Sequence, residues 1–227
     1  MRSHIRDEDL TTMTNLAHAD PSVRFWDRFA ERYAKRPVRD AAAYERKLAL
    51  TQAHLSPDAR VLEFGCGTGS TTLVHAPRVR RLLAIDTSAQ MISICRRKQA
   101  SANAANVEFR QASLFDLDVA HGAFDAVLGL NVLHLLDDYR STVRRVHDLL
   151  RPDGVFVTST VCMKGINPAI GAILRIGAAI GLIPRVAFIA PNELETAITT
   201  TGFEVVEKVL PDKRSGALFL IAKKTAP

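Results

Sequence analysis

The stretch 61–70 reads V-L-E-F-G-C-G-T-G-S and holds the residue types best suited to bind a ligand. An apolar run that contains an acid, Glu63, leads into three glycines at alternating positions, Gly65, Gly67 and Gly69. Glycine adopts positive φ and lets a ligand approach backbone amides closely, because it has no Cβ. A helix that starts after such a turn adds unpaired N–H groups and partial positive charge. The stretch predicts a strand, a tight turn and a helix start that can hold an anionic or nucleoside-containing ligand.

The spacing of the glycines distinguishes between two kinds of nucleotide-binding turn. In the dinucleotide fingerprint G-x-G-x-x-G, the third glycine follows the second by three positions. Ser70 occupies that position here, and the third glycine comes one residue earlier, at Gly69. The order E-x-G-x-G-x-G instead resembles motif I of class I S-adenosylmethionine-dependent methyltransferases. The alternative interpretation of the glycines alone is a tight turn without a ligand.

A second acid supports a nucleoside ligand. Asp86 ends the run L-L-A-I-D, about 20 residues after the glycine turn, where nucleotide-binding folds have the acid that binds ribose hydroxyls. The alternative role for Asp86 is a helix N-cap, since Asp and Ser both cap helices and Ser88 follows. We favour the ribose because of the glycine turn. The resemblance implies that Thr87 and Met91 extend this side of the site, with Met91 near the adenine.

The third predicted strand departs from the family pattern. The family usually has an Asp there that hydrogen-bonds the adenine amino group, whereas this sequence has Ser113 and Leu114. The nearest acids are Asp116 and Asp118. Backbone amides at Ser113 and Leu114 are the remaining candidates to bind the ring.

The fourth predicted strand, F-D-A-V-L-G-L-N-V-L-H, is highly characteristic of the family. The resemblance implies that a backbone carbonyl near Leu130 accepts from the methionine ammonium, with Asn131 at the same strand end. His134 lies just beyond, as a substrate contact or as a helix-cap or cofactor-packing histidine. Tyr33, in A-E-R-Y-A, resembles the N-terminal lid tyrosine of many small-molecule methyltransferases, with helix packing as the alternative.

Methyl transfer from a sulfonium needs little from side chains. It is an in-line displacement, so positioning the acceptor and excluding water supply most of the acceleration. The sequence contains no G-x-S-x-G elbow, no H-E-x-x-H motif and no P-loop lysine. A base helps only when the acceptor is protonated at the working pH. The candidates for a catalytic role are His134 and Tyr33.

Alternating apolar and helical segments define the elements that position these residues. The strand-like runs are 60–64, 82–85, 107–110, 124–130, 155–159, 204–210 and 217–222. The helical segments between them include 69–76, 88–104 and 138–150. This alternation predicts a parallel sheet covered on both faces, with the ligand crevice at the carboxyl ends of the strands. The last two runs have no helix between them and predict an antiparallel hairpin. The fold class is therefore α/β, a three-layer Rossmann-like doubly wound sheet of seven strands with an antiparallel last strand, plus N-terminal helices.

The predicted domain organisation is a flexible N-terminus, 1–20, and one methyltransferase domain, 21–227. The domain divides into an N-terminal helical cap (21–55), a cofactor-binding core (56–160), apolar lid or connecting helices (161–201) and a C-terminal β-hairpin (202–227).

The segment 165–190 is apolar nearly all round, broken only by Arg175 and Arg185. It is too short and too rich in glycine for a convincing membrane span. A buried connecting helix is one interpretation, and a lid over an apolar acceptor is the one we favour. A peripheral contact with a membrane or a partner chain is the third.

Composition limits the remaining classes of function. The net charge of +6 invites a nucleic-acid partner, but the basic residues are dispersed among acids and no N-P-P-Y tetrad follows the fourth strand. Nucleic-acid binding is therefore disfavoured. The three cysteines lack metal-site spacing, so we expect no metal site and a reducing cytoplasm.

These features predict an enzyme that moves the methyl group of S-adenosyl-L-methionine to a small apolar or amphipathic acceptor, such as a quinol, lipid or thiol, and releases S-adenosyl-L-homocysteine. The expected location is cytoplasmic, with peripheral membrane contact through 165–190 as an option. The alternative is a non-catalytic cofactor-binding or scaffold module, favoured by the missing acid at Ser113. The expected cofactor-binding residues are Glu63, Gly65, Cys66, Gly67, Gly69, Asp86, Thr87, Met91, Ser113, Leu114, Leu130 and Asn131.

Overall fold

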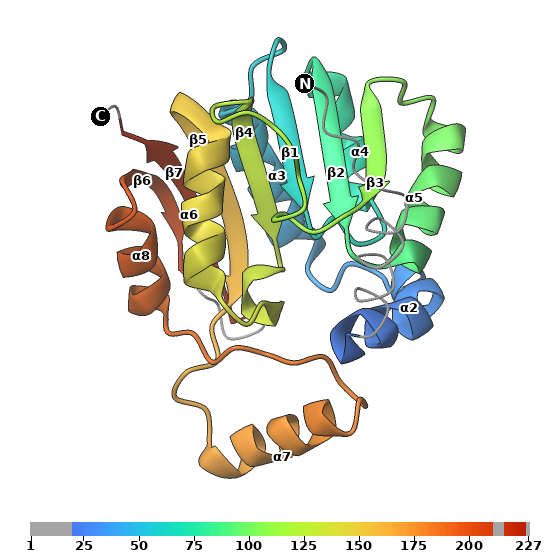
Figure 1. The fold of residues 1–227 in the computed structure, drawn as a ribbon, viewed down its shortest axis with the longest axis vertical. Helices are drawn as coiled ribbons and strands as arrows, with labels where there is room; N and C mark the ends of the chain where they lie inside the picture. Colours follow the sequence, from blue (N-terminus) through green and yellow to red (C-terminus); the bar gives the residue numbers. More distant parts are fainter. Residues whose placement is uncertain (1–19, 211–215, 226–227) are drawn as a thin grey trace, which may run out of the picture.

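A computed structural model describes residues 20–210 and 216–225 of the chain. Its centre is one seven-stranded sheet in the order β3-β2-β1-β4-β5-β7-β6, with helices on both faces (Figure 1). This arrangement confirms the predicted three-layer, doubly wound α/β fold with N-terminal helices. The predicted flexible segment 1–20 lies outside the described residues except for Asp20, as do 211–215 and 226–227 of the predicted hairpin.

The first five strands pair in parallel, and helices form three of the four connections between them; the connection from β3 to β4 contains no helix. They are β1 (Arg60–Phe64), β2 (Arg81–Asp86), β3 (Val107–Gln111), β4 (Phe124–Leu130) and β5 (Leu150–Val161). The last two are β6 (Phe203–Val209) and β7 (Ala217–Lys224). β7 lies antiparallel between β5 and β6, which confirms the predicted last strand. β5 begins five residues before the predicted start at Val155, because Leu150 pairs with Phe124 of β4.

Most helices begin with a side chain that accepts a hydrogen bond from a free backbone amide. Asp20, Asp40, Ser88, Asp138 and Asn167 cap α2, α3, α5, α6 and α7 in this way. The helices are α2 (Pro21–Ala34), α3 (Ala41–Ala53), α4 (Ser70–His75), α5 (Ala89–Ala102), α6 (Tyr139–Leu149), α7 (Pro168–Ala179) and α8 (Pro191–Thr199). Two short 3₁₀ helices are η1 (Ala76–Arg78) and η2 (Leu133–Leu135).

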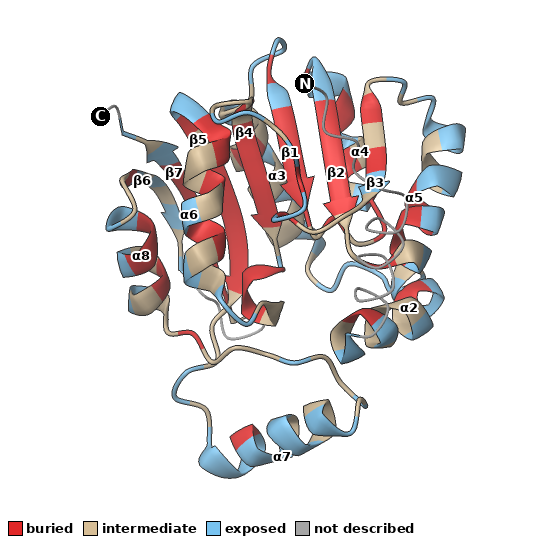
Figure 2. Cartoon of the chain, viewed as in Figure 1, coloured by how far each residue is buried: buried red, intermediate tan, exposed pale blue. Residues whose placement is uncertain are grey.

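The two largest apolar clusters of the core lie on opposite faces of the sheet. Figure 2 shows the central strands as largely buried. Val61 and Leu62 are consecutive in β1 yet belong to different clusters, since successive side chains in a strand point to opposite faces. Leu194 and Ile198 of α8 join the cluster of Leu62. Each fully buried aliphatic side chain contributes about 1.5–3 kcal/mol, so the sheet rigidly positions whatever lies at its strand ends.

Helix α7 stands apart from the sheet (Figure 1). Four isoleucines on one side of α7 and its C-cap, Ile170, Ile173, Ile176 and Ile180, are 53–67% exposed. The connection from β5 to β6 is instead packed on the sheet by α8. The interpretation of the 165–190 segment as a buried connecting helix is therefore wrong for α7, in which Gly171 alone is buried, whereas Ile189 near the end of the segment joins the core.

Candidate functional site

The glycine turn follows β1 and leads into α4. Gly65, Gly67 and Gly69 have φ angles of 62°, 55° and 72°, the left-handed region that favours glycine. A Cβ on Gly65 would lie 2.4 Å from Cγ2 of Val132, and one on Gly69 would lie 2.9 Å from Sγ of Cys95. A Cβ on Gly67 would meet only the ring of Tyr33, at 3.9 Å. Two of the glycines therefore permit close packing, and Gly67 keeps a surface open.

Asp86, at the end of β2, ties this turn to the neighbouring strand. One carboxylate oxygen accepts from the amide of Gly67 and the other from the amide of Ser88, both at 2.9 Å. Burial raises the pKa of Asp86 to about 6, although both hydrogen bonds favour the charged form. The N-cap of α5 is Ser88, which accepts from Met91, so Asp86 is not the cap. Each carboxylate oxygen keeps a lone pair that can accept from a diol.

Glu63 lies beneath the same turn. Its side chain is buried and accepts a hydrogen bond from the hydroxyl of Thr72 at 2.7 Å. Burial raises the pKa of Glu63 to about 7, and the charge of Asp86 adds to that effect. Near neutral pH this carboxyl is therefore poised to lose its proton when a cation approaches.

A cavity of about 610 Å³ opens above these groups. All predicted cofactor residues except Gly69 line it, and so does Tyr33. Gly69 instead caps α4. Several further residues that carry no predicted role also line the cavity; they include Trp26, Tyr44, Thr68, Thr71, Phe115 and Val132. Phe115 could have been found, because an aromatic residue directly follows the predicted adenine-binding pair.

One local hydrogen bond engages a backbone amide that was predicted to bind the adenine ring. The amide of Ser113 donates to Oδ2 of Asp116 at 3.1 Å, so this amide already has an acceptor. Asp116 itself is exposed and does not line the cavity. Of the two amides expected to bind the ring, the one at Ser113 is therefore engaged within its own loop.

The two candidate catalytic side chains lie in different places. Tyr33 lines the cavity and packs edge-on against Trp26, and burial raises the pKa of its phenol. His134, in η2, is buried and does not line the cavity, although Val132 and Leu135 do. Its Nδ1 has no hydrogen-bond partner among the described residues, and burial lowers its pKa to about 4. An imidazole with this pKa is neutral at pH 7 and a weak base.

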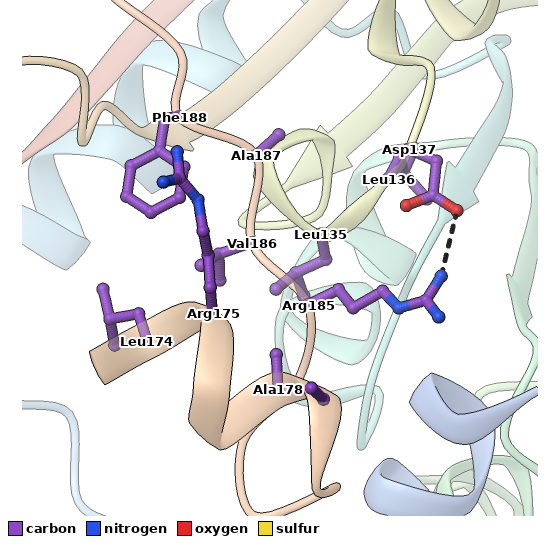
Figure 3. A pocket seen from close by; sticks show the side chains of 11 residues that line it. Leu135, Leu136, Asp137, Leu174, Arg175, Ala178, Arg185, Val186, Ala187 and Phe188 are labelled. Atoms are coloured by element: carbon purple, nitrogen blue, oxygen red, sulfur yellow. Dashed lines mark ion pairs between the residues drawn. The ribbon is translucent and has the colours of Figure 1, made fainter. Parts of the chain in front are cut away.

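A second cavity of about 360 Å³ lies between α7 and η2 (Figure 3). Leu174 and Ala178 line it from α7, and Leu135 and Leu136 line it from the opposite side. These two leucines also line the larger cavity. The two cavities therefore meet at one apolar wall.

Two arginines add polar groups to this second cavity (Figure 3). The guanidinium of Arg175 lies 5.0 Å from the ring centroid of Phe188. Nη1 of Arg185 lies 3.8 Å from Oδ2 of Asp137, which is longer than a charge-assisted hydrogen bond. The cavity thus combines an apolar interior with polar ends.

The described part of the chain contains no group of three or more His, Cys, Asp or Glu side chains that could hold a metal ion. Cys66, Cys95 and Cys162 are free thiols.

Comparisons with known proteins agree with this architecture. Residues 61–154 match the model of a methyltransferase domain family. The ubiquinone biosynthesis O-methyltransferase of Pseudomonas aeruginosa (strain UCBPP-PA14) is 29% identical over 207 residues, covering 85% of this chain and 86% of that protein. The uncharacterized methyltransferase YcgJ of Bacillus subtilis is 28% identical over 110 residues, which are 48% of this chain and 44% of YcgJ.

Solved structures share the fold. The crystal structure of YcgJ superposes with a TM-score of 0.67 at 16% identity, covering 81% of this chain and all of that one. Geranyl diphosphate C-methyltransferase from Streptomyces coelicolor, solved with Mg²⁺, geranyl diphosphate and S-adenosyl-L-homocysteine, gives a TM-score of 0.64 at 15% identity. That match covers 80% of this chain and 79% of that one.

The fold and the family match define a class I methyltransferase domain, as the sequence predicted. The comparisons support methyl transfer as the activity of this chain and S-adenosylmethionine as its cofactor.

Proposed function

We propose that this enzyme transfers the methyl group of S-adenosylmethionine to a small amphipathic acceptor held beneath α7. The observation that carries the proposal is the shared wall of Leu135 and Leu136 between the two cavities. A cofactor in the larger cavity and an acceptor in the smaller one would meet beside these two leucines. Reacting atoms held in line at short range can gain most of the acceleration from positioning.

Two buried acids and one open glycine fit the cofactor. We assign the ribose hydroxyls to Asp86, whose carboxylate is oriented by Gly67 and Ser88. We assign the methionine ammonium to the negative end of the site formed by Glu63 and the carbonyl near Leu130. The open face of Gly67 leaves room for close approach. These assignments use groups whose burial makes charge recognition strong.

The bound sulfonium supplies the electrophilic methyl group. The residues of this chain therefore need only bind the two substrates and exclude water. Leu135 and Leu136 present apolar surface at the meeting point of the cavities, and Val132 adds apolar surface to the larger one. Of the two candidate catalytic residues, Tyr33 alone lines the cofactor cavity, so we propose that it contacts the reacting groups. His134 is proposed to pack behind the wall, because its side chain lies outside both cavities.

The acceptor class follows from the lining of the second cavity. Its interior carries Leu174, Val186 and Ala187, whereas Arg175 and Arg185 supply polar ends. A quinol, a lipid with a nucleophilic head or an alkyl thiol matches this pattern. The relative from Pseudomonas aeruginosa is named for ubiquinone biosynthesis, which supports a quinol-like acceptor.

Calorimetric titration with S-adenosylmethionine and S-adenosylhomocysteine tests the cofactor assignment first. We then expect a screen of alkylated catechols, quinols and thiols with isotope-labelled cofactor to yield at least one methylated product. Polar analogues that lack the alkyl chain serve as controls. Turnover of the polar analogues at equal efficiency would contradict an apolar acceptor cavity.

A non-catalytic module is the second candidate function. Ser113 replaces the usual acid on the adenine side, and its amide is engaged by Asp116, which favours weak cofactor binding. The same titration separates the two functions. Absence of binding by both cofactor forms would reject methyl transfer and leave the scaffold role.

We further propose that the outer face of α7 rests on a cytoplasmic membrane surface that carries anionic lipids. Ile170, Ile173, Ile176 and Ile180 are exposed there, opposite the face that lines the cavity. The segment 165–190 contains two arginines and no Asp or Glu, which suits a negatively charged surface. No helix in the described ranges is long and apolar enough to cross a bilayer, so the proposed contact is peripheral.

Vesicle sedimentation tests this contact. The wild-type protein should sediment with vesicles of mixed phosphatidylcholine and phosphatidylglycerol, and Ile173→Asp should reduce the bound fraction several-fold. Val206→Asp places the same charge at an exposed valine on β6 and should leave binding unchanged. Equal loss in both variants, or no binding by the wild type, would contradict the proposal.

A further inference from the structure

One hydrogen bond joins the N-terminal helix α2 to the turn after α7. Nη2 of Arg28 donates to the carbonyl oxygen of Gly181 at 3.0 Å, across 153 positions of sequence. Figure 1 shows this turn reaching from α7 toward α2. Among the described residues, no other hydrogen bond joins 168–183 to a part of the chain outside 160–191. Six residues further along, the amide of Ala187 donates to the carbonyl oxygen of His134 at 2.7 Å. The position of α7 therefore depends on the Arg28 contact on the α2 side and on the Ala187 contact on the η2 side.

The same helix is attached to the cofactor site. Trp26 and Tyr33 of α2 line the larger cavity. Oδ1 of Asp27 accepts from the hydroxyl of Ser88 at 2.6 Å and from the amide of Gln90 at 3.2 Å. The amide of Ser88 in turn donates to Asp86. A continuous series of hydrogen bonds thus connects α2 with the carboxylate assigned to the ribose.

Consecutive residues of α2 face these two partners. Asp27 contacts the rim of the cofactor cavity and Arg28 contacts the turn after α7. Successive residues in a helix project about 100° apart, so a rigid helix holds both contacts at once. Ala30 of α2 is buried against Met91 and Ile94 of α5, which fixes the helix as a unit. A shift of α2 at the cofactor side would therefore move the attachment of α7.

Two further contacts of α7 are local. Gly171 lies near Phe188, and Gly177 lies near Ile183, two residues of the segment that follows the helix. The outer isoleucines contribute little packing because they are exposed. Regions with few buried contacts open at low free-energy cost, so a single tether can decide whether they are closed.

We propose that Arg28 is a positioning residue that fastens α7 over the acceptor cavity and couples its closure to occupancy of the cofactor cavity. The inference rests on the proposed function, in which α7 covers the acceptor. Cofactor contacts with Trp26 and Tyr33 would restrict the motion of α2. The hydrogen bond from Arg28 would then restrict the motion of the turn at Gly181. Coupling between two binding sites is reciprocal, so a bound acceptor would also slow release of the cofactor.

Hydrogen exchange measured by mass spectrometry tests the tether without any turnover. We expect exchange of 170–184 to be faster in Arg28→Gln than in the wild type, and S-adenosylhomocysteine to slow it in the wild type only. Arg24→Gln is the matched control, since Arg24 is exposed on the same helix one turn earlier. Arg28→Lys keeps a donor and should recover part of the protection. Equal exchange of this segment in Arg28→Gln and Arg24→Gln would overturn the proposal.

Two further readouts separate the tether from the proposed function. Calorimetry on the wild type tests cofactor binding by itself, and its failure would refute the proposed function while the ligand-free exchange comparison still tests the tether. With an acceptor from the screen, Arg28→Gln should raise KM about 5-fold or more, the lower range of typical site coupling. The affinity of the variant for S-adenosylhomocysteine alone should change less than KM does. An unchanged KM would contradict the coupling.

Discussion

The cofactor cavity and the acceptor cavity are built in opposite ways. At the glycine turn, buried carboxyls of Glu63 and Asp86 are held by hydrogen bonds from Thr72, Gly67 and Ser88. At α7, four isoleucines are exposed and one long-range hydrogen bond fastens the turn that follows the helix. The proposed cofactor site is thus part of the packed core, whereas the proposed acceptor cavity is covered by α7, which stands apart from the sheet. Substitutions in α7 should therefore alter the acceptor cavity and leave the cofactor site intact.

The largest expected effect is a loss of stability in Gly65→Ala, at the glycine turn of the cofactor cavity. The new Cβ would meet Val132 at 2.4 Å and would hold a positive φ. Backbone strain of about 1–3 kcal/mol adds to overpacking of similar size, so urea unfolding should reveal a loss of about 2–5 kcal/mol. Gly67→Ala is the control, because its φ of 55° imposes similar backbone strain while its Cβ would meet only the ring of Tyr33, at 3.9 Å. Equal losses in both variants would mean that packing at Val132 is not the cause.

Next in size is a pH effect at Glu63. Its pKa is about 7 in the folded chain, whereas an unperturbed glutamate, as in the unfolded chain, has a pKa of 4.5. The folded state therefore keeps the proton between pH 4.5 and pH 7, where the unfolded state loses it. Stability therefore falls as the pH rises from 4.5 to 7, by up to roughly 3 kcal/mol, because the unfolded state binds fewer protons.

The variant Glu63→Gln isolates this contribution from other groups. Buried His75 and His134 have lowered pKa values and act in the opposite direction. The difference in unfolding free energy between Glu63→Gln and the wild type should shift in favour of the variant as the pH rises through this interval. A constant difference from pH 4.5 to 7 would contradict the raised pKa.

A smaller effect is expected from Asp86→Ala on cofactor affinity. Removing a buried acceptor costs about 1–3 kcal/mol, which is roughly 5- to 150-fold in the dissociation constant for S-adenosylmethionine measured by calorimetry. Asp58→Ala changes an exposed acid and serves as the control. Unchanged affinity in Asp86→Ala would restrict this carboxylate to holding Gly67 and Ser88.

The smallest effect should come from the outer face of α7. Ile173→Asp replaces an exposed side chain, so the free energy of unfolding should change by no more than about 0.5 kcal/mol. Leu194→Ala in α8 is the comparison, since this buried leucine should cost about 2–5 kcal/mol. A large loss in Ile173→Asp would mean that the outer face is part of the core after all.

Most features of the cofactor cavity were predictable from local sequence patterns. The alternation of apolar runs and helical segments predicted the sheet, because the strand and helix periodicities can each be recognised within a short stretch of sequence. The three glycines marked the turn, since positive φ is a local requirement. Asp86 was found by its distance from that turn, although its bonds to Gly67 and Ser88 needed the two strand ends side by side.

The arrangement of residues around the proposed acceptor cavity became evident only from the tertiary structure. The apolar residues of 165–190 suited a buried helix, a membrane contact or the lid that we favoured, because apolarity does not specify what covers it. The exposure of α7 in the folded chain excludes this helix from the core, where α8 packs on the sheet. His134 looked close to the site in sequence, yet the direction of its side chain from η2 leaves it outside both cavities. The contact of Arg28 with Gly181 joins residues 153 positions apart, and no local pattern encodes such a distance.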